Sequence, residues 1–240
     1  MILLFTDFGG SGPYMGEMRT VLLRQAPGVP VVDLMIDAAA FRPDLAAYHL
    51  AALWPTAEPG DVMVAIVDPG VGGPRSPLAV EVDGRWLVGP DNGLLELVLR
   101  RAGAVRGHAI AWRPPRLSAS FHGRDLFAPI AARLARGDRA GLVAQSPTRH
   151  RHWPDDLPAI IHIDGYGNLV TGLRAAMLPP DAVLEVAGQQ LARRRTFADT
   201  APGMAFWYEN SSGLAELAVS SGRAAERLRS TIGDPVRLVG

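Results

Sequence analysis

The sequence VMVAIV at residues 62–67, followed at once by DPG at residues 68–70, decides the fold class. An uninterrupted apolar run of this length is typical of a strand that is buried on both faces of a parallel sheet. The abrupt change to Asp, Pro and Gly ends the strand and starts a loop. Such a strand needs a layer of helices on each side of its sheet, which predicts an α/β domain.

The sequence around this strand alternates short β-rich runs with helical patterns, which favours strand–helix–strand units. The predicted elements of this half are strands at 2–5, 29–35 and 62–67, helices at 14–25, 43–54, 92–101 and 124–136, and a hairpin through residues 83–84. The N-terminal half is therefore predicted to be an α/β domain with a mostly parallel, three-layer sheet.

The sequence changes character at residues 146–158, SPTRHRHWPDDLP, which are rich in proline and charge and are typical of a linker. Beyond them, short β-rich runs separated by turn residues favour a small barrel or sandwich. We therefore predict an α/β domain at residues 1–147, a linker at 148–157 and a small all-β, barrel-like domain at 158–240.

Composition excludes several kinds of site. Of the 240 residues, 48% are hydrophobic and 20% are charged, as in an ordinary globular protein. The 24 basic residues balance the 24 acidic ones, so no overall charge directs the chain to nucleic acid or to an anionic membrane. There is no cysteine, which excludes thiol nucleophiles and thiolate-bound metals. All the basic residues are arginine, which excludes a lysine Schiff base.

The N-terminal sequence MILLFTDFGG has too short an apolar run for a signal peptide, and no basic region precedes that run. No stretch of the chain approaches the roughly 18 consecutive apolar residues of a membrane span. We therefore expect a cytoplasmic enzyme.

Asp7 follows the first predicted strand and precedes Gly9 and Gly10. Ligands of open α/β sheets bind in the loops at the carboxyl ends of the strands. A carboxylate in this loop can accept hydrogen bonds from both hydroxyls of a ribose. A role for Asp7 as the cap of a turn is equally consistent with the sequence.

The loop DPGVGGPR at residues 68–75 places Asp68 and Arg75 seven residues apart at the end of the buried strand. Its glycines allow the backbone to approach a ligand closely, and its prolines stiffen it. Taken alone, Asp-Pro-Gly indicates a turn more often than a site. A similar segment, GPDNG at residues 89–93, precedes a predicted helix, for which we expect Asp91 or Asn92 to be the N-cap.

His122 lies in the segment SFHGRD at residues 120–125. A histidine in a glycine-flanked loop is a stronger catalytic candidate than a histidine on a helix face. Arg124 and Asp125 can form an ion pair at the start of the next helix. The histidines of the chain have no metal-binding spacing such as His-Glu-x-x-His, so we predict no metal site.

Two turn-like segments of the second half carry polar and aromatic side chains. DGYGN contains Asp164, Tyr166 and Asn168, while ENSSG contains Ser211 and is followed by Glu216. Such groups can bind a purine edge and an amino-acid carboxylate. Hairpin turns explain both segments nearly as well.

Each of these motifs is weak alone, but their order along the chain is specific: TDFG, DPGVG, PDNG, FHGRD, DGYGN and NSSG. Over residues 1–237 this series resembles the S-adenosylmethionine (SAM) hydroxide adenosyltransferases, which hydrolyse SAM to adenosine and methionine. It is also similar to the related fluorinases and chlorinases, which attack the same carbon with halide. The resemblance implies an α/β catalytic domain, a β-barrel substrate-binding domain, and a homotrimer whose active sites lie between subunits.

The resemblance also implies roles for single residues. It assigns the activation of the attacking water to Asp68, Arg75 and His122. It further implies that Asp7 holds the ribose hydroxyls, Asp164 the methionine ammonium, Asn168 the adenine edge and Ser211 the methionine carboxylate, with Tyr166 and Glu216 as further substrate-binding residues.

The chemistry is consistent with these roles. A sulfonium is already a good leaving group, so displacement at the ribose 5′ carbon needs no general acid, and we expect no metal or other cofactor. It needs an oriented, partly deprotonated water, which an arginine favours electrostatically and which a carboxylate and an imidazole orient. Halide attack needs a pocket without a competing anionic side chain. The presence of Asp68, Arg75 and His122 therefore favours hydrolysis over halogenation.

Two segments depart from the family pattern. Residues 11–14 are Ser-Gly-Pro-Tyr where relatives often have an acidic residue, and Gly172 stands where asparagine is common. The resemblance therefore implies no substrate contacts for these residues. Tyr166 replaces the more usual phenylalanine and keeps a stacking face.

Two other functions stay open on the sequence. One is a 5′-halogenase, in which halide attacks the same carbon of SAM. The other is a protein that binds adenosine or SAM without turnover.

Overall fold

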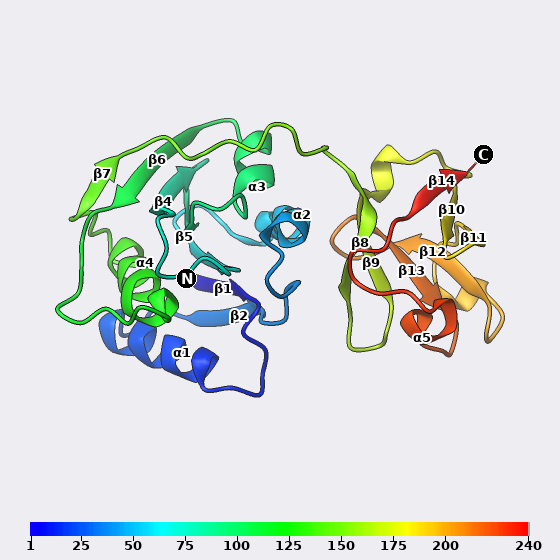
Figure 1. Cartoon of the computed structure of the whole chain (residues 1–240), viewed down its shortest axis with the longest axis horizontal. Coiled ribbons are helices and arrows are strands. Elements are labelled where there is room, and N and C mark those ends of the chain that lie inside the picture. The colour runs from blue at the N-terminus through cyan, green and yellow to red at the C-terminus, as the bar shows by residue number, and fades with distance from the viewer. Residues whose placement is uncertain (240) are drawn as a thin grey trace. The chain divides into compact units, whose positions relative to one another are not determined.

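The structure is a computed structural model that describes residues 1–239. The chain divides into two compact units, Met1–His152 and the residues from Trp153 onward (Figure 1). The assignment of catalytic and substrate-binding roles to these two parts of the chain stays a prediction.

The first unit is built on a seven-stranded sheet in which β3 (Val62–Ile66) is buried along its whole length, as its apolar sequence predicts. The order across the sheet is β2-β1-β3-β5-β4-β6-β7. The first four of these strands are parallel, and the last three pairings are antiparallel. The other strands are β1 (Ile2–Thr6), β2 (Val31–Met35), β4 (Pro77–Val82), β5 (Arg85–Pro90), β6 (Val105–Ile110) and β7 (Leu142–Ala144).

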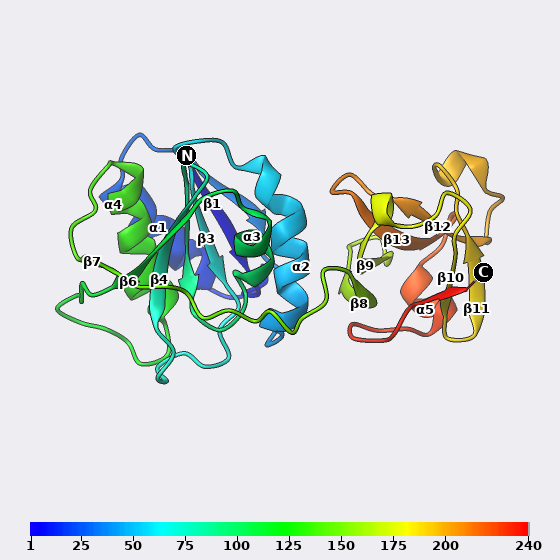
Figure 2. The same ribbon diagram turned by 90° about the horizontal axis from the view of Figure 1, so that it is seen from above.

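Helices cover both faces of this sheet. Figure 2 shows α1 and α4 on one face and α2 and α3 on the other. The resulting three layers confirm the predicted α/β class. The bounds of these helices are α1 (Tyr14–Gln25), α2 (Pro43–Leu53), α3 (Glu96–Arg101) and α4 (Ala128–Ala135), with a 3-10 turn at Trp54–Thr56.

The two faces of β1 show how the core is divided. Ile2 and Leu4 belong to the cluster that packs beneath α1 and α4. The side chain of Phe5 lies on the other face, where its ring meets the edge of His49 of α2 with the ring centroids 6.5 Å apart. Because successive residues of a strand point to opposite faces, an uninterrupted apolar sequence fills both cores.

Two helices begin later than the sequence predicts. Gly93 has φ +97°, so the chain after β5 makes a turn before α3 begins at Glu96. The helix predicted from Arg124 opens instead with a π-helical turn at Gly123–Phe127 and becomes regular only at Ala128. Single π turns are frequent near functional sites, and this one directly follows His122.

The second unit is built from antiparallel strands, which confirms the predicted all-β class. Its core surrounds Trp207, whose fully buried indole Nε1 donates to the carbonyl of Ala182 over 2.8 Å. One sheet has the order β12-β13-β9-β8 and the other β11-β10-β14. The elements are β8 (Leu157–Ile163), β9 (Leu169–Arg174), β10 (Val183–Val186), β11 (Gln189–Ala192), β12 (Ala205–Glu209), β13 (Leu214–Val219), β14 (Arg237–Val239), the short helix α5 (Ala224–Leu228) and 3-10 turns at Ala175–Met177 and Phe197–Asp199.

The segment predicted as a linker is hydrogen-bonded at both of its ends. The hydroxyl of Thr148 donates to Asp91 over 2.8 Å, and Arg149 pairs with the buried carboxylate of Glu96. At the other end, Arg174 of β9 holds Asp156 through its Nε and its Nη2, at 2.8 and 2.6 Å. These contacts fix each end of the segment to a different unit.

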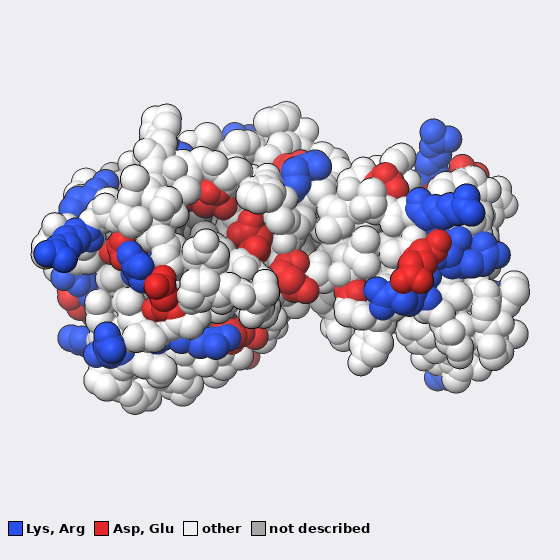
Figure 3. All heavy atoms as spheres, turned by 60° about the horizontal axis from the view of Figure 1, so that its bottom comes forward, with Lys and Arg blue, Asp and Glu red and all other residues white. Residues whose placement is uncertain are grey.

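Among the described residues, no helix combines the length and the apolar character that crossing a bilayer requires. Figure 3 shows basic and acidic side chains interspersed on the visible face of each unit. This agrees with the balanced composition of the chain.

Candidate active site

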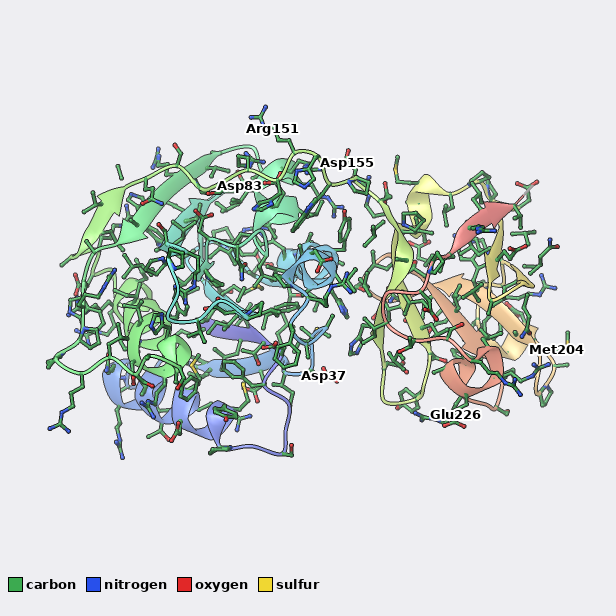
Figure 4. All side chains as sticks on the ribbon, viewed as in Figure 1. Asp37, Asp83, Arg151, Asp155, Met204 and Glu226 are labelled. Atoms are coloured by element: carbon green, nitrogen blue, oxygen red, sulfur yellow. The ribbon has the colours of Figure 1, made fainter. Side chains whose placement is uncertain are left out.

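The loops that carry Asp7 and Asp68 leave the same edge of the sheet, because β1 and β3 are parallel neighbours. The loop after β1 is also tied to the loop after β2, since Gly9 N donates to the carbonyl of Ile36 over 2.6 Å. Figure 4 labels Asp37 just beyond the end of β2. The carboxyl edge of the parallel strands is where ligands of open α/β sheets bind.

A cavity of about 440 Å³ opens at this edge. Three of the predicted site residues, Asp7, Asp68 and His122, line it. Arg75, the fourth predicted residue of this unit, is bonded directly to two of them. The remaining lining residues are mainly apolar: Phe8, Tyr14, Ala40, Phe41, Ile66, Pro69, Val71, Ser120, Phe121 and Gly123.

Arg75 joins Asp68 to His122. Its Nε donates to both carboxylate oxygens of Asp68, at 3.1 and 3.0 Å, and its Nη2 donates to Asp68 Oδ2 as well. The same Nη2 lies 3.1 Å from Nδ1 of His122. The side chains of Arg75 and Asp68 are only 10% and 5% exposed, so this is a buried, bidentate and charge-assisted pair.

The contact with Arg75 fixes the tautomer of His122. A guanidinium has only donors, so Nδ1 of His122 must be the acceptor, and the neutral ring then carries its proton on Nε2. Burial lowers the pKa of His122, and the positive charge of Arg75 lowers it further, while the charge of Asp68 opposes this. His122 is therefore neutral at pH 7.

The loop of residues 68–75 reaches His122 because of a glycine. Gly72 has φ +78°, and a Cβ at this position would lie 2.4 Å from the carbonyl oxygen of Ala119. Only glycine allows the backbone of this loop to lie against the segment that leads to His122. On the other side, the guanidinium of Arg75 lies over the ring of Phe127, 5.4 Å from its centroid.

Asp7 is hydrogen-bonded to the segment between β2 and α2. Its Oδ2 accepts a hydrogen bond from the backbone N of Phe41 over 3.2 Å. Burial raises the pKa of Asp7 and the negative charge of Asp68 raises it further, whereas the bond from Phe41 opposes the rise. Asp7 and Asp68 are thus close enough for their charges to interact across the cavity.

Aromatic residues that the sequence analysis did not select form much of the cavity wall. Phe121 meets Phe8 and Tyr14 edge to face, with ring centroids 5.7 and 5.3 Å apart. Phe8 and Phe121 are chain neighbours of Asp7 and His122, a signal that could have indicated them. Phe41 is 74% exposed and has φ +62°, and nothing in the sequence pattern around it indicates a place at the site.

The second unit has a cavity of about 820 Å³ that gathers the other predicted site residues. Phe197, Tyr208, Asn210 and Arg223 also line it. The predicted residues found there are Asp164, Tyr166, Asn168, Ser211 and Glu216. The structure therefore brings the candidates together in two groups, one in each unit.

The segment DGYGN is the turn between the antiparallel strands β8 and β9. Asp164 Oδ1 accepts hydrogen bonds from the backbone N of Tyr166 and of Asn168, at 2.9 and 2.8 Å. Asp164 Oδ2 accepts from Asn168 Nδ2 over 3.1 Å. The hairpin-turn interpretation is thus correct, and the same turn presents both side chains to the cavity.

Glu216 is 5% exposed and both of its carboxylate oxygens have donors. Tyr208 donates from its hydroxyl over 2.5 Å and Asn210 from its Nδ2 over 2.9 Å. Asn210 Oδ1 in turn accepts from Ser212 N at 3.0 Å and from Leu214 N at 3.0 Å. Glu216 therefore supports the turn on which Ser211 lies. Burial raises the pKa of Tyr208, and its bond to Glu216 adds to the rise.

The glycine at position 172, where the sequence departs from the family pattern, has a structural reason. A Cβ on Gly172 would lie 2.7 Å from the Cβ of Leu157, its partner across the β8–β9 ladder. A side chain at this position would separate the two strands.

The described residues contain no cluster of three or more histidine, cysteine or carboxylate side chains placed to hold a metal ion. The polar groups of the first cavity include two carboxylates and an imidazole that is bound to an arginine. Such a set can orient and polarise a small nucleophile.

Comparison with known proteins links both units to one family. The N-terminal domain model of the SAM hydroxide adenosyltransferases matches residues 2–143, and the C-terminal domain model matches residues 158–237. The chain is 39% identical to an (R)-S-adenosyl-L-methionine hydrolase from Thermus thermophilus, with 99% of both chains covered. It is 36% identical to an (R)-S-adenosyl-L-methionine hydrolase from Salinispora arenicola, with 97% of this chain and 95% of that protein covered.

Solved structures agree with these matches. A conserved hypothetical protein from Thermus thermophilus is 34% identical, covers 99% of both chains and superposes with a TM-score of 0.78. An uncharacterized conserved protein from Thermotoga maritima shares the fold, with a TM-score of 0.86 at 24% identity over 100% of both chains. From the two domain matches and the identity over nearly its whole length, the chain belongs to the SAM hydroxide adenosyltransferase family.

Proposed function

We propose that the protein hydrolyses SAM to adenosine and methionine by attack of water on the ribose 5′ carbon. The observation that carries this proposal is the single guanidinium of Arg75, which binds Asp68 and His122 at the edge of the first cavity. Full-length relatives that are called SAM hydrolases support the same activity.

In the proposed reaction the oxygen of water forms a bond to C5′ while the C5′–S bond breaks. The electron pair of that bond goes to sulfur, which leaves as the neutral thioether of methionine. The proton lost by water passes to Asp68, because His122 already accepts from Arg75 at Nδ1 and carries its own proton on Nε2. His122 and Arg75 then act as donors that stabilise hydroxide character on the attacking oxygen.

The proposed substrate contacts follow the resemblance. Asp7 accepts from the ribose hydroxyls in the first cavity, a role that its place beside Asp68 supports. In the second cavity, Asp164 binds the methionine ammonium, Asn168 the adenine edge and Ser211 the methionine carboxylate, while Tyr166 offers a stacking face and Glu216 supports the turn.

The charge at the first cavity favours water over halide as the nucleophile. Asp7 and Asp68 both line the cavity, and since Arg75 balances the charge of Asp68, the carboxylate of Asp7 is the group whose negative charge would repel a halide ion. A water molecule, in contrast, can donate a hydrogen bond to Asp68. Halogenation is therefore the weaker second candidate.

We further propose that the protein acts in the cytoplasm as a homotrimer, with each active site formed by the N-terminal domain of one subunit and the C-terminal domain of the next. The division of the candidate residues between two cavities supports a shared site. The resemblance stated above is the basis for three subunits.

The proposal is tested by incubating purified protein with SAM in the absence of added metal. Release of adenosine and methionine in equal amounts is expected. Asp68→Asn keeps the size of the side chain but removes its charge, so we expect SAM binding without turnover. Asp33→Asn is the matched control, because it breaks an exposed Asp–Arg pair, with Arg19, away from the cavity. Binding without turnover by the wild type would favour a non-catalytic SAM-binding protein.

A further inference from the structure

The side chain of Asn92 reaches the end of the strand that leads to Asp68. Its Nδ2 donates to the carbonyl oxygen of Val67 over 2.9 Å. Its Oδ1 accepts from the backbone N of Leu94 over 3.2 Å. The sequence suggests Asn92 as a candidate N-cap of α3. It is not the N-cap, because α3 begins only at Glu96. It bonds instead to a residue 25 positions away in the chain.

The neighbouring residue holds the other end of the same loop. The backbone N of Asp91 donates to the carbonyl of Ser76 over 2.9 Å. Val67 and Ser76 directly flank the loop of residues 68–75, which contains Asp68 and Arg75. Residues 91 and 92 therefore bind the chain on both sides of this loop.

The hydrogen bond from Asn92 lies beyond the end of the ladder between β3 and β5. The pairing of β3 with β5 ends at Val64 and Val88. Val67 lies beyond it and is 0% exposed, so its carbonyl needs a partner inside the protein. The turn that presents Asn92 depends on Gly93, whose φ is +97°.

We propose that Asn92 is a positioning residue for the reaction, which fixes the carbonyl of Val67 and thereby the direction in which Asp68 and Arg75 face His122. This inference rests on the proposed function of the site. Asn92 does not touch the cavity, so it acts through Val67 and the loop that follows.

Two substitutions test this role. Asn92→Asp keeps the shape of the side chain and the acceptor for the backbone N of Leu94. It replaces the donor to Val67 with a carboxylate oxygen, which the carbonyl oxygen of Val67 repels. Asn92→Ala removes both hydrogen bonds and adds no charge near Asp68. The two variants separate a loss of position from a change in charge.

Asp83→Asn is the matched control. It is the reverse swap in another turn of the same unit, where Asp83 accepts from Gly103 N and Ala104 N at 3.2 and 2.7 Å. Asp83, labelled in Figure 4, precedes β5 whereas Asn92 follows it, so the two turns lie at opposite edges of the sheet. Asparagine tolerates the φ of +49° at this position.

We expect both Asn92 variants to lower kcat about 10- to 100-fold, the usual effect of displacing reacting groups by a fraction of an ångström to an ångström. KM for SAM should change little, because Asp7 is on a different loop. Asp83→Asn should keep the kcat of the wild type. A kcat that falls in all three variants in proportion to thermal stability would overturn the proposal, since the role would then be structural.

A second readout needs no catalysis. Burial lowers the pKa of His122, and the positive charge of Arg75 lowers it further; the other charged groups around the ring are Asp68, Arg113 and Asp125. In Asn92→Ala the guanidinium moves away, so the pKa of His122, followed by NMR titration of its ring protons, should rise toward that of an ordinary histidine. It should stay unchanged in Asp83→Asn.

The two readouts distinguish the possible failures. If the wild type does not hydrolyse SAM, the proposed function fails, but the titration still shows whether Asn92 sets the place of Arg75. If folded Asn92→Ala has the kcat and the His122 pKa of the wild type, the positioning role is wrong.

Discussion

Arg75 contributes more to the candidate site than its residue type suggests. The sequence contains only arginine among its basic residues, so the choice of arginine over lysine carries no information there. In the structure, one planar guanidinium donates to Asp68 in a bidentate way and also reaches His122. This geometry needs several donors in a fixed arrangement, which a lysine ammonium lacks.

We therefore expect Arg75→Lys to lose activity although it keeps the charge. The ammonium cannot serve both Asp68 and His122, so kcat should fall about 10²- to 10³-fold, as when a donor to a developing oxyanion is removed. The measurement is steady-state hydrolysis of SAM. Arg19→Lys, at the exposed pair with Asp33, is the control and should behave like the wild type. An Arg75→Lys enzyme with normal kcat would show that charge alone suffices.

The lowered pKa of His122 makes both stability and activity depend on pH. An unfolded histidine titrates near pH 6.5, whereas the folded ring takes up its proton only at lower pH. Below pH 6.5 the unfolded chain therefore binds more protons, and the stability that is present above 6.5 is lost as the pH falls toward the folded pKa. Protonation also turns Nδ1 into a donor that faces Arg75, so kcat should fall over the same range.

The check on this pH effect is a comparison with His122→Gln. The free energy of unfolding of the wild type should decrease relative to that of the variant as the pH is lowered below 6.5. Two unfolding curves that stay parallel from about pH 7.5 to about pH 5 would show that the pKa of His122 is not lowered.

At the scale of elements, burial decides how much of the fold can be predicted. The strand β3 and the helix α1 follow from their apolar patterns because one or both faces enter the core. The strand β6 has the sequence VRGHAI and lies mostly at intermediate or high exposure in the antiparallel part of the sheet, so no periodicity marks it. β6 forms because its backbone pairs with that of β4, and the burial of its side chains contributes little.

The loop of residues 68–75 offers a test of close packing at this scale. Gly72→Ala would strain a backbone with φ +78° and would also place a methyl group 2.4 Å from the carbonyl of Ala119. Gly28→Ala strains a similar backbone, with φ +83°, but meets nothing within 4 Å. We expect Gly28→Ala to cost about 1 to 2 kcal/mol of stability and to keep kcat.

Gly72→Ala should cost more stability than Gly28→Ala, and it should also lower kcat, because the loop must move away from the segment that holds His122. The free energy of unfolding and kcat are measured for both variants. Equal losses of stability, with kcat unchanged in both, would mean that the close approach at Gly72 does not position the site.

The sequence predicts the charged residues of the candidate site, but it does not predict the aromatic residues that form the cavity wall. Asp68 and His122 stand out because one directly follows a buried strand and the other lies next to a glycine in a loop. Phe41 reaches the cavity through a left-handed backbone, and Asn92 acts through a bond to Val67. Contacts of this kind depend on tertiary structure, so local sequence patterns do not reveal them.

At the scale of the molecule, the candidate residues fall into two cavities, one in each unit. If each active site joins two subunits, mixed oligomers of two inactive variants regain activity. Asp68→Asn disables the first cavity, and Ser211→Asp places a carboxylate where the methionine carboxylate would bind. Co-expression of the two should restore roughly a quarter of the sites in a ring of random composition.

Complementation is measured as SAM hydrolysis by the co-expressed, co-purified variants, and the oligomeric state is measured by light scattering. The separately purified variants are the controls. A mixture as inactive as its components, in an oligomer shown to contain both, would place all the residues of one site within a single subunit.

The most direct test of water as the nucleophile follows the oxygen atom. The purified protein is incubated with SAM in water enriched in heavy oxygen, and the adenosine is analysed by mass spectrometry. Hydrolysis by a water that Asp68 orients predicts one labelled oxygen, located at the 5′ position. Adenosine without label at its 5′ oxygen, or a 5′-halogenated nucleoside formed when halide is present, would contradict it.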